Sequence, residues 1–384
     1  MNKSFSAILD ACRWIAAFLV VIAHARQFIL VRYENVEHKD IFVKGFYFIT
    51  GFGHEAVMVF FVISGFLVGG LTLRKWSVQI RYRDYFAARV SRIYTVLIPA
   101  LFVGGSLDWL GLHYLNTSEI YTISSSLPVN LVIVENLNLI TLIGNFFNLQ
   151  GVIVPTFGSN IPLWSLANEW WYYMIFAAGL VCWFDRVAFA RLTALIIGGA
   201  LVVFLPPKLI IWMLIWLLGV GVYLYAESSL PKPPRSIGLI IFFIALVASR
   251  MSHNVENAPI AELTFVGFCR DFGFSLAFSI FLLGYFKRNF VFPKEKISKV
   301  LADFSYSMYA FHFPILVFLV ALMHDVFGVK YMRQLDIMGM AYFVMVVVLL
   351  YVIGYLLSRV TERHSYMIRA MISRKVNAEI VRDS

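Results

Sequence analysis

The chain has 384 residues, of which 60% are hydrophobic and only 14% are charged, and its mean hydropathy is +0.79. Soluble domains are about one quarter charged, so this composition excludes a soluble globular protein and a disordered one. In a soluble protein, a net charge of +10 would indicate a nucleic-acid partner. In an apolar chain such as this one, the meaning of the charge depends on where the basic residues lie relative to the apolar segments. We therefore expect an all-α polytopic membrane protein, with membrane lipids and not nucleic acid as partners.

Ten segments are long and apolar enough to cross a membrane, because a crossing helix needs about 20 mostly apolar residues. They are 8–30, 55–73, 90–111, 166–184, 192–206, 208–226, 236–250, 265–286, 301–323 and 337–358. The segment 127–150 is also apolar, but Asn130, Glu135, Asn136, Asn138, Asn145 and Asn148 interrupt it. We predict that it is re-entrant or interfacial; if it crosses instead, every later helix is inverted.

The distribution of Lys and Arg predicts the orientation. With a cytoplasmic N-terminus, most of the 32 basic residues fall in cytoplasmic segments, and 112–165 contains none, as the positive-inside rule requires. Both termini are then cytoplasmic. Asp10 and Arg13 interrupt the first apolar segment and no cleavage site follows, so the first helix is expected to stay in the protein. We expect one membrane-embedded domain over 1–360 and a short basic cytoplasmic tail over 361–384.

The first span contains two ionisable side chains, Arg13 and His24, and such groups are costly in a bilayer and mark function. Their spacing of eleven residues places both on nearly the same helix face, about 16 Å apart along the axis. Because imidazole can take a proton from a hydroxyl near neutral pH, His24 is a candidate catalytic base. A histidine that is hydrogen-bonded between helices is an equally good interpretation of this residue alone.

A second polar cluster, WSLANEWWYYMIF over 164–176, opens the fourth span. Glu169 is its only carboxylate, and Tyr172 and Tyr173 follow at i+3 and i+4 on the same side of a helix. Glu169 could orient a histidine or bind a sugar hydroxyl, while Trp164 and the two tyrosines could stack on a sugar ring. The structural alternative is an interfacial aromatic belt with one glutamate that reaches the interface.

Arg89 and Arg92 form an i,i+3 pair at the cytoplasmic start of the third span. Two guanidinium groups on one face suit the phosphates of an anionic cofactor, although a positive-inside anchor has the same appearance.

Polar side chains also interrupt the ninth span, in the sequence FSYSMYAFHFPI. The polar groups are Ser305, Tyr306, Tyr309 and His312, of which Tyr309 and His312 are candidate substrate contacts, and Pro314 should kink the helix.

The remaining motifs favour structural roles. In FFVISGFLVGG of the second span, Ser64 and three glycines, Gly65, Gly69 and Gly70, allow close helix approach, and no base adjacent to Ser64 is evident. The three cysteines are too far apart for a disulfide framework or a zinc site, and no metal is expected.

Two further pairs of ionisable residues lie near the ends of spans. His54 and Glu55 precede the second span and are expected either to line an entrance or to be solvated. Arg270 and Asp271 are neighbours in the eighth span, and because adjacent helix residues diverge, each is expected to have its partner on another helix.

Taken together, these segments resemble the acyltransferase 3 family of integral membrane acyltransferases. The matching features cover about residues 8–360 and comprise Arg13 with His24, the FFVISGF block, Arg89 with Arg92, the WSLANEWWYY block and SYSMYAFHFP. One feature departs from the family, because the common Glu-Arg-Pro after the last span is Glu362-Arg363-His364 here.

The resemblance implies a bacterial inner-membrane enzyme that transfers an acyl group from cytoplasmic acyl-CoA, with acetyl-CoA as the first candidate, to a hydroxyl of a sugar or glycan. It implies that His24 is the essential histidine, with Arg13 as its companion. Arg89 and Arg92 become acyl-CoA contacts, and Glu169 becomes the polar partner near the acceptor. Direct transfer and a transient acyl-histidine are both compatible with these residues.

The alternative class is a proton-coupled glycolipid transporter or flippase in which His24 and Glu169 form a proton relay. Such a protein should have inverted hydropathy repeats with paired broken helices. The sequence does not show them, so we expect an O-acyltransferase.

Overall fold

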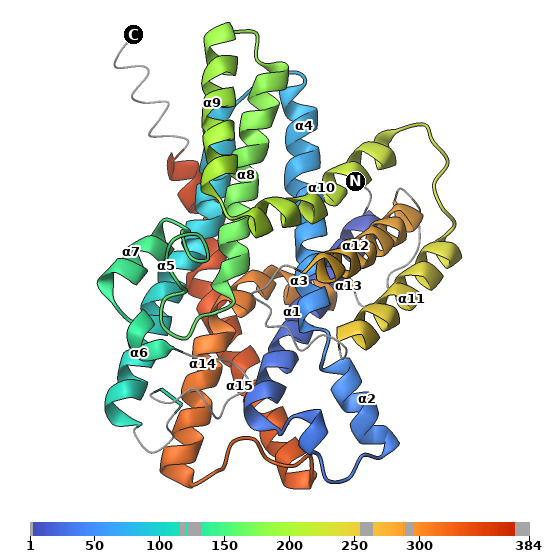
Figure 1. Cartoon of the computed structure of the whole chain (residues 1–384). Helices are drawn as coiled ribbons and strands as arrows, with labels where there is room; N and C mark the ends of the chain where they lie inside the picture. The colour runs from blue at the N-terminus through green and yellow to red at the C-terminus, as the bar shows by residue number, and fades with distance from the viewer. Residues whose placement is uncertain are drawn as a thin grey trace. The chain divides into compact units, whose positions relative to one another are not determined.

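The computed structural model describes residues 3–115, 120–121, 132–253, 264–286, 288 and 295–372 (Figure 1). Within these ranges the regular structure is helical, and the β-type pairings are two isolated bridges, so the expected all-α fold is confirmed. The helices are α1 (Lys3–Ile29), η1 (Tyr33–Asn35), α2 (Ile41–Ile49), α3 (Gly53–Ser64), η2 (Gly65–Gly70), α4 (Leu71–Trp76), α5 (Tyr82–Tyr114), α6 (Ile133–Asn136), α7 (Leu139–Phe146), α8 (Leu163–Phe184), α9 (Ala188–Phe204), α10 (Pro207–Glu227), α11 (Arg235–His253), α12 (Phe265–Tyr285), α13 (Glu295–Asp303), α14 (Ser305–Phe327), α15 (Ile337–Val360) and η4 (Glu362–His364).

Eight helical stretches in the described ranges are long and apolar enough to cross a membrane. They are Lys3–Ile29, Ile41–Trp76, Tyr82–Tyr114, Pro207–Glu227, Arg235–Ser252, Phe265–Tyr285, Ser305–Phe327 and Ile337–Ile372. Each corresponds to one of the ten expected spans, so the chain is a polytopic membrane protein. The other two expected spans are also helical, but α9 has only 17 residues, and Asn168 and Glu169 lower the hydropathy of α8.

The segment 127–150 is described from residue 132 onward, and its helices α6 and α7 have four and eight residues. Neither can cross a hydrocarbon core about 30 Å thick, which agrees with a re-entrant or interfacial segment. The side chain of Asn138 caps α7. Buried Asn145 donates from Nδ2 to the Pro155 carbonyl (2.8 Å) and accepts at Oδ1 from the Phe157 N–H (3.0 Å). The asparagines that interrupt the apolar pattern therefore hold this segment in place.

The chain divides into two compact units, and each unit is assembled from separate stretches of sequence. Unit 1 comprises Met1–Ala16, His54–Tyr85 and Asn168–Val300, and unit 2 comprises Ala17–Gly53, Phe86–Ala167 and Leu301–Ser384. Helices α1, α3, α5, α8 and α13 contribute residues to both units. Of the expected tail, residues 373–384 lie outside the described residues.

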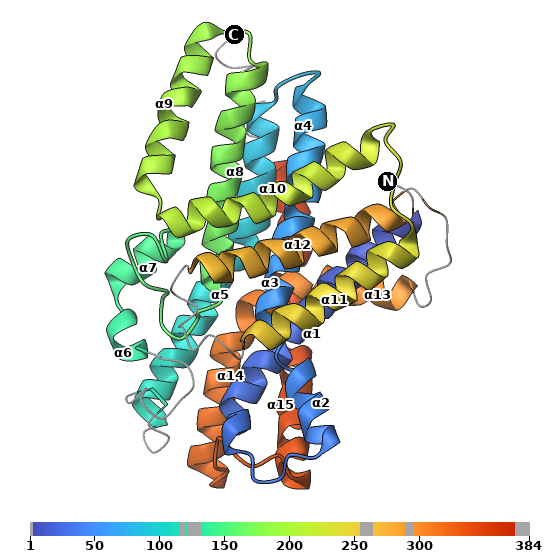
Figure 2. The same ribbon diagram turned by 45° about the vertical axis from the view of Figure 1, so that its right-hand side comes forward.

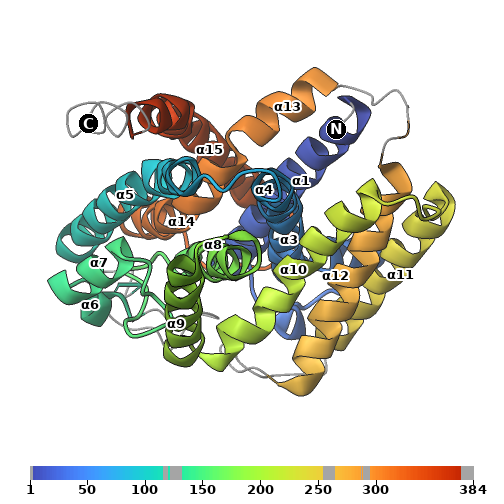
Figure 3. The same ribbon diagram turned by 90° about the horizontal axis from the view of Figure 1, so that it is seen from above.

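In unit 1, the motif FFVISGFLVGG packs its backbone directly against α10. A Cβ atom at Gly65 would lie 1.8 Å from the Trp216 carbonyl oxygen, and one at Gly219 would lie 2.0 Å from the Val62 carbonyl oxygen. The expected close helix approach is confirmed. After Ser64 the helix widens into the π-helix η2, a geometry that often marks functional sites. Helices α11 and α12 of the same unit lie side by side (Figures 2 and 3).

In unit 2, α14 is buried from Ser305 to Val317 except at Tyr306, and this part of the helix lies in the core. Phe28 of α1, Ala100 of α5, Phe311 of α14 and Val346 of α15 belong to one apolar cluster. Gly104 of α5 faces Pro314 of α14, where a Cβ atom would make an ordinary van der Waals contact at 3.4 Å. This packing fixes the helix that carries Tyr309 and His312.

Candidate active site

Two histidines from distant parts of the sequence meet in unit 2. Nδ1 of His24 on α1 lies 2.8 Å from Nε2 of His312 on α14, and the two rings are nearly parallel, with an interplanar angle of 13°. His312 is buried, whereas His24 is partly accessible. Phe313 packs its ring edge-on against His24, with centroids 5.0 Å apart. The sequence placed both histidines in the site but did not indicate that they are bonded to each other.

The hydrogen bonds define which ring nitrogens carry protons. Nδ1 of His312 lies 2.8 Å from the Tyr309 carbonyl oxygen, and a carbonyl can only accept, so this nitrogen must donate. In a neutral His312 the other nitrogen, Nε2, is then an acceptor. His24 must donate to it from Nδ1, which leaves the lone pair of His24 on Nε2. The pair therefore presents His24 as a neutral imidazole whose basic nitrogen is Nε2.

Tyr309 has a positioning role in this arrangement. Its carbonyl orients His312, and its hydroxyl lies 2.6 Å from Oγ of Ser165 and donates to the Pro162 carbonyl at 3.2 Å. The side chain is buried. Asn160 donates from Nδ2 to the Ala310 carbonyl at 2.9 Å, so the segment before α8 holds α14 beside the histidine at two points.

Glu362 fixes the beginning of α14. Its Oε2 accepts from both the N–H and the hydroxyl of Ser307, each at 3.1 Å. Ser307 lies in the first turn of α14, where N–H groups lack helical partners and negative charge is stabilising. Glu362, the first residue of the Glu362-Arg363-His364 motif, is thus a helix cap. His364, which stands where proline was expected, lies two residues after the capping glutamate.

A second polar cluster lies in unit 1 around Glu169. Oε1 of Glu169 accepts from the hydroxyl of Ser64 at 2.5 Å and also from the hydroxyl of Tyr173. Nε1 of Trp216 donates to Oγ of Ser64 at 3.1 Å. Within the described ranges, no hydrogen bond is formed to Oε2 of Glu169, and Glu169 is partly accessible. The cluster thus holds one carboxylate oxygen and leaves the other for a further donor.

The expectation that Ser64 has no adjacent base is wrong, because the carboxylate of Glu169 accepts a hydrogen bond from the serine hydroxyl. The two residues are 105 positions apart, so no local pattern could have indicated the contact. The glycines after Ser64 did indicate that another helix packs closely here, and that helix is α10.

The aromatic residues of the WSLANEWWYY block do not act as one group. The hydroxyl of Tyr173 donates a hydrogen bond to Glu169. Tyr172 is completely buried and packs edge-on against Phe61, with centroids 5.6 Å apart. Trp164 is half-buried in the first turn of α8 and belongs to unit 2, whereas Glu169 belongs to unit 1.

The candidate arginines lie in the first half of their helices. Arg13 lies on α1 in unit 1, with Nη1 3.9 Å from Oδ1 of Asp10. Arg89 and Arg92 lie on the part of α5 that belongs to unit 2, and both are partly accessible. The guanidinium group of Arg92 stacks over the ring of Tyr306 on α14 at 5.3 Å.

Two expectations about outlying ionisable residues need correction. His54 and Glu55 are not solvated: Nε2 of His54 is 2.8 Å from Oδ2 of Asp271, and buried Glu55 accepts from Ser249 at 2.8 Å. Asp271 therefore has the expected partner on another helix. However, Nε of Arg270 is also only 3.3 Å from Oδ1 of Asp271, because the long arginine side chain bends back toward its neighbour. These residues form a polar cluster of their own in unit 1.

Comparison with known sequences adds a family assignment. The sequence profile of the acyltransferase 3 family, described as an acyltransferase domain, matches residues 6–372. No curated protein and no solved structure matches the chain significantly. The profile covers nearly the whole sequence, including both histidines and the Glu169 cluster. The chain is therefore an integral membrane acyltransferase and belongs to the acyltransferase 3 family.

Proposed function

We propose that the protein is an O-acyltransferase that transfers an acyl group, with acetyl as the first candidate, from cytoplasmic acyl-CoA to a hydroxyl of a sugar or glycan. The observation that carries this proposal is the hydrogen bond from Nδ1 of His24 to Nε2 of His312, because it leaves the Nε2 lone pair of His24 for the acceptor. The partial accessibility of His24 and the burial of His312 support a division of roles. His24 is the base, and His312 is the residue that orients it.

In the proposed reaction, Nε2 of His24 takes the proton of the acceptor hydroxyl while the hydroxyl oxygen attacks the thioester carbonyl. The carbon–sulfur bond then breaks, and the CoA thiolate receives the proton from His24. The products are the O-acyl ester and free CoA, and His24 returns to its neutral form. Exclusion of water from the proposed site would protect the thioester from hydrolysis.

The donor is proposed to bind with its phosphates at Arg89 and Arg92. Paired guanidinium groups recognise phosphate oxygens well, and the stacking of Arg92 on Tyr306 orients one of them. Tyr306 and His312 lie on the same helix, and their spacing of six residues corresponds to a rise of about 9 Å. The proposed phosphate contact and the proposed base thus lie beside different levels of α14, which agrees with a donor whose phosphates and thioester lie at opposite ends.

The acceptor is proposed to contact Glu169, whose Oε2 can accept a hydrogen bond from a sugar hydroxyl. Ser64 and Tyr173 hold Oε1 and so fix the carboxylate. Trp164 is the proposed stacking residue. Tyr172 in unit 1 and Tyr309 in unit 2 are proposed as supporting residues, each within its own unit, since both side chains are buried. Arg13 is proposed as the companion of His24 on α1, and the bacterial inner membrane as the location.

The test is acyl transfer by purified protein with acetyl-CoA and a panel of glycan acceptors. Both CoA release and the mass of the acylated acceptor are measured for wild type, His24→Ala and the control His324→Ala, which changes a histidine near the end of α14. We expect acceptor-dependent product from wild type and the control, and none from His24→Ala. Product formation by His24→Ala at the wild-type rate would contradict the proposed role of the histidine.

A further inference from the structure

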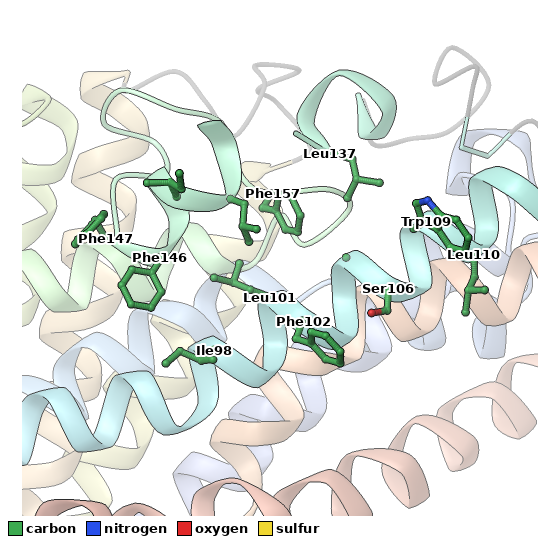
Figure 4. A pocket seen from close by; sticks show the side chains of 13 residues that line it. Ile98, Leu101, Phe102, Ser106, Trp109, Leu110, Leu137, Phe146, Phe147 and Phe157 are labelled. Carbon is green, nitrogen blue, oxygen red and sulfur yellow. The ribbon is translucent and has the colours of Figure 1, made fainter. Parts of the chain in front are cut away.

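A large apolar cavity lies in unit 2, on the side of α5 that faces α7 (Figure 4). Its volume is about 920 Å³, which is within the range of about 300–1,000 Å³ that is usual for ligand sites. Ile98, Phe102 and Leu110 line it from α5, and Ile143 and Phe146 line it from α7. None of the 13 lining residues is charged, so the ligand is recognised by apolar contact.

The orientation of α7 indicates what covers this cavity. The helix buries Thr141 and Asn145, whereas its apolar side chains are exposed, with Ile140 at 77% and Ile143 at 49%. A helix that turns its polar face inward and its apolar face outward needs hydrocarbon and not water around it. Phe102 on α5 is similarly exposed, at 76%, within a helix that is long enough to cross the membrane.

The length of the cavity matches a single lipid chain. The lining positions on α5 run from Ile98 to Leu110, a helical rise of about 18 Å. One leaflet of a hydrocarbon core about 30 Å thick has a depth of about 15 Å. At the Leu110 end, Trp109 lines the cavity and stacks on His113 with centroids 4.3 Å apart, as expected near a membrane interface.

One wall of the cavity also belongs to the segment that holds the histidine helix. Phe157 lines the cavity and packs so closely on Gly105 that a Cβ atom there would lie 2.6 Å from its ring. Two residues further on, the Ser159 N–H donates to Oδ2 of buried Asp108 at 2.7 Å. The next residue, Asn160, is bonded to α14 at the Ala310 carbonyl. An occupant of the cavity therefore braces the segment on which α14 rests.

We propose that this cavity is a binding site for one acyl chain of a membrane phospholipid, which fills the space between α5 and α7 and supports the segment from Phe157 to Asn160. Recognition is through the chain and not the headgroup, because the lining carries no charge. This site is separate from the proposed acyl-CoA and acceptor sites and does not depend on them.

The test uses the full-length protein in detergent micelles that contain no phospholipid, to which phosphatidylcholine that carries a photoreactive diazirine near the end of one chain is added in rising amounts. After illumination, labelled peptides are quantified by mass spectrometry as the probe fraction rises. We expect labelling of α5 and α7 to saturate, whereas labelling of α15, which has exposed apolar residues such as Val348 and Val352, rises linearly with bulk lipid. Linear labelling at both places would overturn the proposal.

Two tryptophan variants of α7 show whether labelling depends on free space in the cavity or only on the outer surface of the helix. Ile143→Trp places extra volume in the cavity and should abolish the saturable labelling, whereas Ile140→Trp, on the same helix but outside the lining, should leave it unchanged. Ser106→Phe fills the cavity from α5 and repeats the test if the first variant does not fold. Replacing phosphatidylcholine by phosphatidylglycerol should not alter the saturation; a strong preference for the anionic lipid would contradict recognition through the chain.

Discussion

His24 and His312 are 288 residues apart in the sequence, yet Nδ1 of the first lies 2.8 Å from Nε2 of the second. Since the Tyr309 carbonyl requires a proton on Nδ1 of His312, Nε2 of the neutral ring is an acceptor, and His24 must then be the donor. The tautomer of the candidate base is thus determined by a backbone carbonyl one turn away on α14.

Removal of the acceptor nitrogen should misorient the base. We expect His312→Ala to lower kcat by about 10- to 100-fold, the effect usual for a group that orients another. His312→Gln should restore much of the activity, because its amide oxygen can occupy the place of Nε2 and accept from His24. The measurement is kcat at saturating acyl-CoA and acceptor for each variant.

His324→Gln provides the matched control for this prediction, because it changes another partly buried histidine on α14. It should keep wild-type kcat. If His312→Gln folds but is as inactive as His312→Ala, acceptance of the His24 proton is not the function of His312.

A variant of Glu169 can show whether the negative charge of this side chain contributes to acceptor binding. Glu169→Gln keeps an oxygen that can accept from Ser64 and Tyr173 but removes the negative charge. If Oε2 binds the acceptor as an anion, this variant should raise KM for the acceptor by about 10-fold, which corresponds to a charged hydrogen bond of about 1.5 kcal/mol. The KM for acyl-CoA, measured in the same assay, should not change.

Ser64→Ala should have a smaller effect than Glu169→Gln, because Tyr173 still donates to Oε1. The double variant Ser64→Ala/Tyr173→Phe removes both donors and should approach the loss of Glu169→Gln. An activity of the double variant equal to wild type would show that orientation of the carboxylate is not needed.

Arg92 should act on the donor and not on the chemistry. Arg92→Ala is expected to raise KM for acyl-CoA by about 10-fold or more with little change in kcat, since a phosphate contact contributes about 1.5–3 kcal/mol. Arg92→Lys should recover only part of this binding, because an ammonium group lacks the planar guanidinium fork and its stacking on Tyr306.

Arg359 is the control for a basic residue that serves only as a membrane anchor. Like Arg92, it stacks on a tyrosine ring, in this case Tyr355, but it lies at the end of α15. Arg359→Ala should leave KM for acyl-CoA unchanged. Equal effects of the two alanine variants would favour the anchor interpretation for both.

Loss of the cap on α14 should be visible as lower stability. Glu362→Ala removes the acceptor of the Ser307 N–H and hydroxyl, and a helix cap contributes about 1 kcal/mol. The expected fall in Tm is about 2 °C for a chain of this size, measured by thermal unfolding in detergent. Glu362→Gln should lose less, and Glu34→Ala, at an exposed glutamate, should not change Tm.

The sequence by itself determined the class of the fold. Long apolar segments require helices in a bilayer, because backbone groups must be bonded within the segment, and the eight helices long and apolar enough to cross a membrane follow from this rule. Polar residues inside such segments are costly, which is why His24, Glu169 and His312 could be singled out before any contact was known. The asparagines of 127–150 similarly indicated a segment that does not cross.

Only the tertiary structure decided which of these polar groups are partners. A helix face specifies neighbours three or four residues away, and the Glu169–Tyr173 contact is of this kind. The bonds of His24 to His312, of Ser64 to Glu169 and of Ser307 to Glu362 join different helices and depend on how those helices pack. The cost of leaving a polar group unpaired in an apolar surrounding requires that partners exist, and packing determines which residues they are.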